Sequence, residues 1–295
     1  ELCGIELAGP LLPAAGTVSE EALAEAHSAY GAVLPKTVTP KARAGNPPPR
    51  LAEAPSGMVN SIGLQNPGLD RFLENLGNYD VGLPLFVSVA AETVGEFAAM
   101  CGRLASDDRV SAVELNLSCP NVEHCGLSFC AAPANVAEVV AACSGTLPSA
   151  KLLSAKLTNE DVVANALAAE RAGADALTLI NTIPALVVDA QEKKVFLRGG
   201  LSGPAIKPVA LRAVYEVSRA VGIPVIGCGG VASGTDVAEF MLAGAAAVQV
   251  GAGSFARDPE DILGEFAAYL KENGLRARDL TGLIHTESRE PHDII

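Results

Sequence analysis

Near the middle of the chain lies the stretch Val113-Glu114-Leu115-Asn116-Leu117-Ser118-Cys119-Pro120-Asn121. Apolar and polar residues alternate over its first six positions, which is the period of a β-strand. Pro120 ends the pattern, because proline has no N–H to continue a hydrogen-bonded ladder. The stretch therefore predicts a strand that delivers two amides, a hydroxyl and a thiol to a loop at its carboxyl end. A lone cysteine at the end of a strand is commonly buried and inert. The polar residues beside Cys119 favour the alternative, a thiol that transfers a proton.

Buried strands alternate with helices along the whole chain. Strands are expected at 11–17, 32–37, 83–89, 112–118, 152–157, 176–181, 224–227 and 247–250, and helices at 20–30, 70–78, 93–104, 135–143, 160–172, 209–220, 235–243 and 259–272. Most of these strands are near-continuous apolar runs, which is typical of parallel strands buried on both faces.

Eight strand–helix units in 295 residues predict an α/β fold. The expected architecture is one (β/α)8 TIM barrel forming a single domain over residues 1–295, with excursions at 40–67 and 184–208, after the second and sixth strands. A doubly wound sheet is the alternative, although it would use fewer strands.

The composition excludes several classes of protein. The net charge is −13 and no basic stripe is present, which argues against binding to nucleic acid or to anionic membranes. No apolar run reaches the roughly 20 residues of a membrane span, and no signal segment opens the chain. We therefore expect a soluble, cytoplasmic protein.

The seven cysteines are scattered and odd in number, so reduced thiols are expected rather than disulfides. Cys119, Cys125 and Cys130 do lie close together in the sequence, but their spacing matches no zinc or iron–sulfur pattern. No metal site is expected.

Polar residues gather where the predicted strands end, and active sites of such barrels lie at the carboxyl ends of the strands. These ends carry two lysines, two asparagines and several hydroxyls, at Lys36, Thr37, Ser88, Asn116, Lys156, Asn181 and Thr182. A lysine is rarely buried without a partner, so lysines in these positions indicate a site rather than core filling.

Glycine-rich runs follow the last two predicted strands, at Gly227-Cys228-Gly229-Gly230 and Gly251-Ala252-Gly253. Glycine allows backbone N–H groups to approach phosphate oxygens, and the loops after strands seven and eight commonly form the phosphate site of such barrels. The chain has neither a G-x-G-x-x-G nor a Walker A pattern. The phosphate is therefore expected to belong to a mononucleotide such as FMN or to a phosphorylated substrate.

Several long motifs together resemble those of one enzyme family. The strand and loop Glu114–Asn121 resemble the signature of class 1 dihydroorotate dehydrogenases, as do Gly45-Asn46-Pro47-Pro48-Pro49-Arg50 and the loop Asn60–Gly68. The stretch Gly199–Pro208 is similar to class 1B in particular. The likeness covers nearly the whole chain in register.

This resemblance implies a barrel that binds FMN and oxidises dihydroorotate to orotate, with Cys119 as the catalytic base. The positions that match substrate-binding residues of the family are Lys36, Asn60, Gly63, Leu64, Asn116, Asn121, Asn181 and Thr182. Those that match cofactor-binding residues are Ala15, Gly16, Lys36, Thr37, Ser88, Asn116, Lys156, Gly203, Gly229, Gly230, Gly251 and Ala252. Lys156 matches the lysine that lies beside N1 of the flavin.

The resemblance also implies a partner. Class 1B enzymes pass electrons to NAD through a subunit that carries FAD and an iron–sulfur cluster, and this chain has no cluster motif of its own. A homo-oligomer or hetero-oligomer is therefore expected. A class 2 enzyme would have a serine base and a membrane segment, and a fumarate-reducing class 1A enzyme remains the other possibility for the acceptor.

Some positions depart from the family pattern, namely Ala15, Pro35 and Cys130-Ala131-Ala132. Three other functions stay open from the residues alone. One is an FMN domain like that of dihydropyrimidine dehydrogenases, and another is a Schiff-base lyase that uses Lys156. The third is a flavin-carrying scaffold without catalysis.

Overall fold

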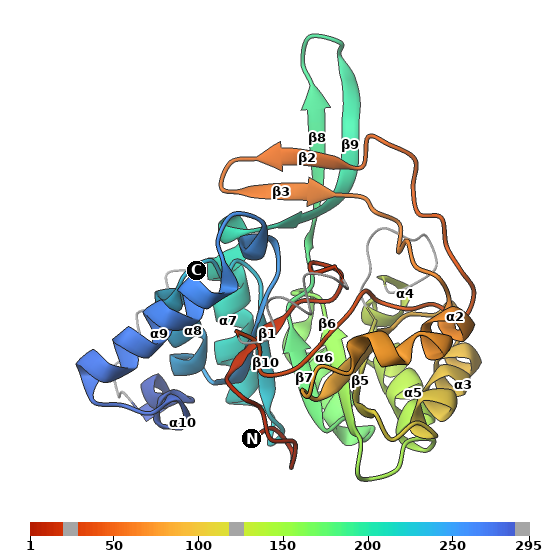
Figure 1. The fold of residues 1–295 in the computed structure, drawn as a ribbon. Coiled ribbons are helices and arrows are strands. Elements are labelled where there is room, and N and C mark those ends of the chain that lie inside the picture. Colours follow the sequence, from red (N-terminus) through yellow and green to blue (C-terminus); the bar gives the residue numbers. More distant parts are fainter. Residues whose placement is uncertain (20–28, 118–126, 287–295) are drawn as a thin grey trace.

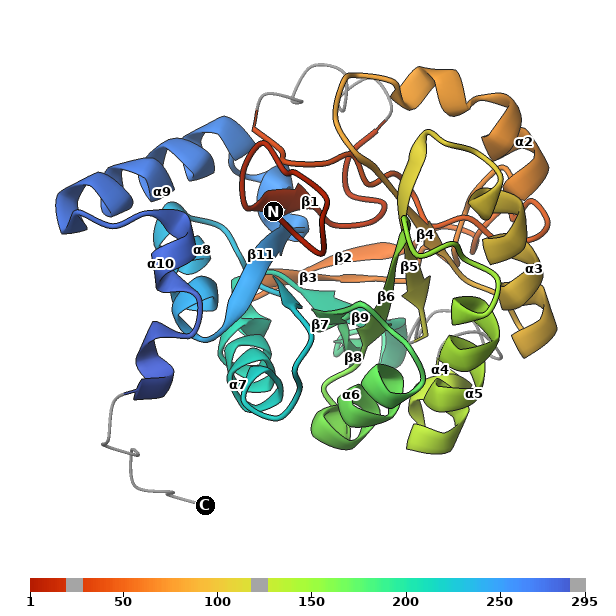
Figure 2. The ribbon, with the colours of Figure 1, turned by 90° about the horizontal axis from the view of Figure 1, so that it is seen from below.

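The computed structural model describes residues 1–19, 29–117 and 127–286. Its centre is a seven-stranded sheet in which every neighbouring pair of strands is parallel. Figure 2 shows this sheet curled, with helices on its outside. In spatial order the strands are β1 (Leu11–Pro13), β11 (Ala245–Val250), β10 (Val225–Cys228), β7 (Ala176–Leu179), β6 (Leu152–Leu157), β5 (Val110–Asn116) and β4 (Leu85–Val89). The predicted α/β fold with parallel strands is confirmed.

The two edges of this sheet, β1 and β4, are linked by hydrogen bonds to the segment 31–38. The Gly31 N–H donates to the carbonyl of Leu11 in β1, and Val33 and Val38 form isolated parallel bridges to β4. The sequence predicts a continuous strand at 32–37, and this detail is wrong. Pro35 lies in the middle of the segment and has no N–H to donate, which accounts for bridges in place of a ladder.

Helices cover the outer face of the curled sheet (Figure 2). They are α2 (Leu69–Glu74), α3 (Val94–Ala105), α4 (Leu127–Cys130), α5 (Pro133–Ser144), α6 (Val162–Arg171), α7 (Lys207–Ser218), α8 (Gly234–Leu242), α9 (Pro259–Asn273) and α10 (Ala277–Leu280). Short 3₁₀ helices occupy Leu76–Tyr79, Pro204–Ile206, Ala252–Phe255 and Leu283–Thr286. The helix expected at 20–30 falls mostly outside the described residues. Within the described ranges, every helix is too short or too polar to cross a lipid bilayer.

A second, antiparallel sheet is built from the two stretches that interrupt the strand–helix alternation. Its order is β2 (Leu51–Ala54), β3 (Gly57–Asn60), β9 (Lys194–Ser202) and β8 (Ile183–Asp189). The strands β3 and β9 pair with each other although they are far apart in the sequence. In Figure 1 this sheet lies at one end of the curled sheet, and the β8–β9 hairpin projects away from it.

The interior of the curled sheet has an apolar level and a polar level. A separate apolar cluster, which Leu2 and Ala32 also join, takes one residue from each strand and Leu34 from the segment 31–38: Leu12, Leu34, Phe86, Ala112, Leu152, Ala176, Ile226 and Ala247. Because side chains alternate along a strand, the residue two positions further faces the same way. Those residues are Ala14, Lys36, Ser88, Glu114, Ser154, Thr178, Cys228 and Gln249. The interior therefore becomes polar toward the carboxyl ends of the strands.

Two glycines on neighbouring helices offer a test of how tightly the outer layer packs. A β-carbon at Gly234 in α8 would overlap the backbone of Phe266 and the side chain of Glu265 in α9. We expect Gly234→Ala to lower the free energy of unfolding by about 1–3 kcal/mol, the usual cost of overpacking, in denaturant titrations.

The matched control is Gly264→Ala within α9, where an added β-carbon meets nothing within 4 Å. Alanine is the better helix former by about 0.5–1 kcal/mol, so this variant should be slightly more stable than the parent chain. Equal stability of the two variants would contradict the close α8–α9 contact.

Candidate active site

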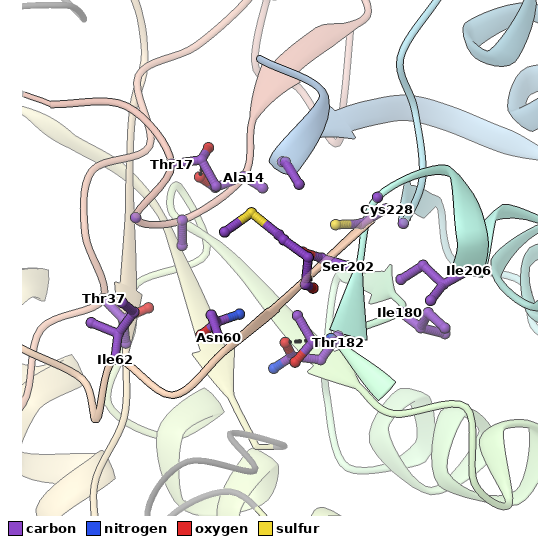
Figure 3. A pocket seen from close by; sticks show the side chains of 18 of the residues that line it. Ala14, Thr17, Thr37, Asn60, Ile62, Ile180, Thr182, Ser202, Ile206 and Cys228 are labelled. Carbon is purple, nitrogen blue, oxygen red and sulfur yellow. Dashed lines mark hydrogen bonds between the residues drawn. The ribbon is translucent and has the colours of Figure 1, made fainter. Parts of the chain in front are cut away.

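A cavity of about 250 Å³ lies at the carboxyl ends of the parallel strands. Its floor and walls come from the strand ends, while Leu51, Met58, Asn60 and Ser202 line it from the antiparallel sheet. Figure 3 shows Asn60 and Thr182 across the cavity from Ala14 and Thr17. A water molecule occupies about 30 Å³ of liquid, so the space suits an organic ligand rather than a few waters.

Most of the residues that the sequence singles out line this cavity. They are Ala15, Gly16, Lys36, Thr37, Asn60, Leu64, Asn116, Lys156, Asn181, Thr182, Gly203, Gly229, Gly230, Gly251 and Ala252.

Four other predicted site residues are placed differently. Ser88 is buried behind the cavity wall, where its hydroxyl shares a hydrogen bond of 3.0 Å with that of Thr37. Gly63 is not a lining residue, although it is flanked by two that are. Cys119 and Asn121 lie outside the described residues, so their roles remain predictions.

Hydrogen bonds hold the asparagine side chains that line the cavity. Asn181 Nδ2 donates to Asn116 Oδ1 at 3.2 Å, which fixes the Asn116 side chain where β5 ends. Asn60 Nδ2 donates to the Gly200 carbonyl at 3.4 Å, and the backbone N–H of Thr182 donates to Asn181 Oδ1. Amide groups that are held in this way present both donors and acceptors to the cavity, as recognition of a heterocycle with its own amide groups requires.

Two lysines bring positive charge to the cavity. The Lys36 side chain lies against Gly16, where an added β-carbon would be 2.7 Å from Lys36 Nζ. Lys156 is almost completely buried and donates to Gln249 Oε1 at 2.8 Å, while its Nζ lies 3.6 Å from Glu114 Oε1. The cavity therefore favours a ligand that carries negative charge.

Lys156 stays in its charged, ammonium form although its side chain is buried. Burial by itself lowers the pKa of Lys156, but Cys228 and Glu114 more than offset this and hold the pKa above its ordinary value of 10.5. Burial likewise raises the pKa of the Cys228 thiol above 9.0. At pH 7 Cys228 is a neutral thiol, so its contribution is a hydrogen bond, and the carboxylate of Glu114 is the charge that stabilises the ammonium.

Glycines form part of the wall where β10 ends. Gly229 and Gly230 have φ angles of +127° and +85°, which residues with a side chain rarely adopt. A β-carbon at Gly230 would also lie 2.7 Å from the Lys207 backbone nitrogen. Only glycine therefore lets this loop pack against the start of α7 while its backbone faces the cavity.

Comparison with known proteins identifies the family. A family model described as dihydroorotate dehydrogenase matches residues 1–267. The chain belongs to the dihydroorotate dehydrogenase family. A relative from Desulforudis audaxviator (strain MP104C) is 43% identical over 302 residues, covering 96% of each chain. Another from Anoxybacillus flavithermus (strain DSM 21510 / WK1) is 45% identical over 289 residues, covering 93% of this chain and 91% of the relative.

Both relatives are named dihydroorotate dehydrogenase B (NAD(+)), catalytic subunit. The resemblance to class 1B dihydroorotate dehydrogenases that the motifs carry is thus confirmed. The fold also matches the crystal structure of DHODH in complex with ferulenol from Eimeria tenella, with a TM-score of 0.82 and 23% identity. That match covers 97% of this chain and 88% of the other, and at this identity it concerns the fold alone.

Several residues of this dihydroorotate dehydrogenase site are absent from the sequence-based prediction. Glu114 and Gln249 belong to the buried network around Lys156, and a signal for them exists in the sequence. Each is a polar residue two positions after an apolar residue that faces the interior, Ala112 before Glu114 and Ala247 before Gln249. Leu51, Met58 and Phe255 line the cavity from outside the curled sheet, and no periodic pattern places them there.

The buried ion pair gives a direct test of this part of the site. Lys156→Met removes the counter-charge of Glu114, which is 2% exposed, and leaves an uncompensated charge in the interior. We expect the free energy of unfolding at pH 7 to fall by about 3–5 kcal/mol in denaturant titrations. The double variant Lys156→Met/Glu114→Gln should lose less, because the uncompensated charge is gone.

The control is Lys194→Met, which removes an ion pair with Glu192 in which the side chains are 60% and 66% exposed. Such pairs contribute about 0–1 kcal/mol. If Lys156→Met costs no more than Lys194→Met, the buried pair does not stabilise the fold as described.

Proposed function

We propose that this chain is the FMN-binding catalytic subunit of a dihydroorotate dehydrogenase, acting in pyrimidine biosynthesis as a single (β/α)8 barrel domain. The observation that carries the proposal is the cavity itself, in which two lysines and three asparagines meet at the strand ends of a chain that matches the family from residue 1 to residue 267. Dihydroorotate and orotate are carboxylates with ring amides, so their chemistry complements those side chains.

The residues of the cavity also suit FMN. A buried ammonium and a wall of glycine backbone fit a ligand that combines a heteroaromatic ring with a phosphate. We assign the cofactor to Ala15, Gly16, Lys36, Thr37, Ser88, Asn116, Lys156, Gly203, Gly229, Gly230, Gly251 and Ala252. Ser88 would act through its hydrogen bond to Thr37. When bound, FMN supplies the hydride acceptor.

The substrate is assigned to a second set of residues, which shares Lys36 and Asn116 with the first. Lys36 pairs with the carboxylate of dihydroorotate, and the amides of Asn60, Asn116, Asn121 and Asn181, with Thr182, hydrogen-bond its ring groups. The backbone of Gly63 and Leu64 adds contacts to the carboxylate. Cys119 takes the proton from C5 while the hydride leaves C6. An ordinary cysteine has a pKa of about 8.5, so the thiolate that acts as the base is a minority form at neutral pH unless its surroundings lower that pKa.

A Schiff-base reaction is disfavoured by the state of Lys156. Such a nucleophile must be a neutral amine, which requires a lowered pKa. Burial does lower the pKa of Lys156, but Cys228 and Glu114 raise it above its ordinary value. The lysine therefore serves as a cation rather than as a nucleophile.

Anaerobic addition of dihydroorotate to the purified, FMN-loaded chain tests this function, and we expect the flavin absorbance to bleach. Cys119→Ala should retain FMN but be reduced about 10²–10⁴ times more slowly, because a positioned base contributes a factor of that order. Cys119→Ser should keep a small part of the rate. The measurement is stopped-flow absorbance, with the extracted cofactor identified by mass.

Cys3→Ala is the matched control, since Cys3 is an exposed thiol, and it should be reduced at the parent rate. Near-parental reduction of Cys119→Ala would move the base to another residue, with Cys125 and Cys130 tested next. A parent chain that binds FMN but is never reduced by dihydroorotate would point to a flavin-carrying scaffold.

We further propose that the electrons reach NAD through a second subunit that carries FAD and an iron–sulfur cluster. The relatives are named as catalytic subunits of NAD(+) enzymes, and this chain has no nucleotide fingerprint of its own for NAD. We therefore expect the isolated chain to turn over with an artificial dye but not with NAD or fumarate in steady-state assays. Brisk NAD reduction by the isolated chain would refute the need for a partner, and brisk fumarate reduction would assign the chain to class 1A.

A further inference from the structure

A chain of buried polar side chains links four strands beneath the cavity. Glu114 Oε2 in β5 accepts hydrogen bonds from Thr178 Oγ1 at 3.0 Å and from Gln249 Nε2 at 2.7 Å. Gln249 Oε1 in turn accepts from Lys156 Nζ at 2.8 Å. All four side chains are buried, and Lys156 is the member of the chain that lines the cavity.

The directions of these hydrogen bonds follow from the donor groups. A carboxylate only accepts, so the NH₂ group of Gln249 must point to Glu114 and its carbonyl oxygen must point to Lys156. The single hydroxyl proton of Thr178 goes to Glu114, so Ser154, 3.1 Å away, donates to Thr178. The neutral groups, Gln249, Thr178 and Ser154, therefore orient their dipoles so that they stabilise a negative charge on Glu114, and Gln249 also stabilises a positive charge on Lys156.

The titratable and polar groups that face Lys156 come from separate strands. Glu114 approaches from β5 at 3.6 Å, and Cys228 approaches from β10 with a pKa that burial raises. Gln249 approaches from β11 and carries no charge, while Lys36 lines the same cavity. The Glu114 carboxylate is thus placed to keep Lys156 protonated. The Gln249 amide is placed to fix the orientation of the Lys156 ammonium group.

We infer that Glu114 and Gln249 are positioning residues that hold the Lys156 ammonium at the cavity and thereby set how readily FMN bound there takes up electrons. This inference rests on the proposed function. Reduction places negative charge on the flavin, so a nearby ammonium favours it and a nearby carboxylate opposes it. Glu114 has both effects, because it repels negative charge itself and keeps Lys156 charged.

The test is the midpoint potential of FMN in the full chain between pH 6 and pH 9, set against reference dyes so that no substrate is needed. At pH 6 we expect Glu114→Gln to raise the ratio of reduced to oxidised FMN at a fixed potential about tenfold, or about 30 mV for a two-electron couple. The gain should disappear toward pH 9, because Lys156 loses its proton more easily without the carboxylate. The parent chain should show no corresponding break in its profile of potential against pH, because Glu114 keeps Lys156 charged over this range.

Glu114→Asp keeps the charge and should restore the parental pH profile, which a loss of packing alone would not explain. Gln249→Met removes both hydrogen bonds and should likewise weaken the hold on the Lys156 proton, so that its profile also departs from the parental one toward pH 9. Glu74→Gln removes an exposed charge on α2 and should leave the potential unchanged at every pH.

The inference is overturned if Glu114→Gln and Gln249→Met bind FMN with the parental potential across the whole range. If Glu114→Gln does not fold, Gln249→Met and Glu114→Asp decide the matter in the same measurement. Failure of the proposed function looks different, since the parent chain would then bind FMN yet stay oxidised in the presence of dihydroorotate.

Discussion

The structure depends on one buried ion pair, between Lys156 in β6 and Glu114 in β5. Their side chains are 7% and 2% exposed, and removing such charges from water costs several kcal/mol for each ion. The pair is tolerable because two other strands supply further partners, Thr178 from β7 and Gln249 from β11. These strands must keep their register, since a slip of one residue would turn each polar side chain to the opposite face.

The apolar level below the pair secures that register. Phe86, Leu152 and Ile226 are almost fully buried two positions before Ser88, Ser154 and Cys228. Burial of an aliphatic or aromatic side chain contributes about 1.5–3 kcal/mol, so a slip would forfeit this from several strands together. The apolar level therefore stabilises the strand register that places Glu114 and Lys156 together in the polar level.

The sequence predicts this layout well wherever the period of the strands determines it. The strand ends, and with them Lys36, Asn116 and Lys156, follow from counting along apolar runs, and these residues do line one cavity. The strand expected at 32–37 is replaced by isolated bridges because Pro35 interrupts it. The period cannot predict contact between distant stretches, so nothing in the sequence pattern assigns Met58 or Ser202 to the cavity. The role of Cys119 rests on the motif alone.

Contact between distant stretches also decides how the cover over the cavity is built. Asn60 ends β3 opposite Gly200 in β9, and its amide donates to the carbonyl of that residue. A β-carbon at Gly199 would overlap the Asn60 carbonyl, and one at Gly57 would overlap that of Ser202, so small residues on both strands permit the approach. Neither excursion holds Asn60 in place alone. Lys156 and Lys36 belong to the curled sheet and its edge segment. Asn60 instead belongs to the antiparallel sheet, which forms by pairing of residues 51–60 with residues 183–202. Changes in that pairing would displace Asn60 from the cavity while leaving the buried charge beneath it intact.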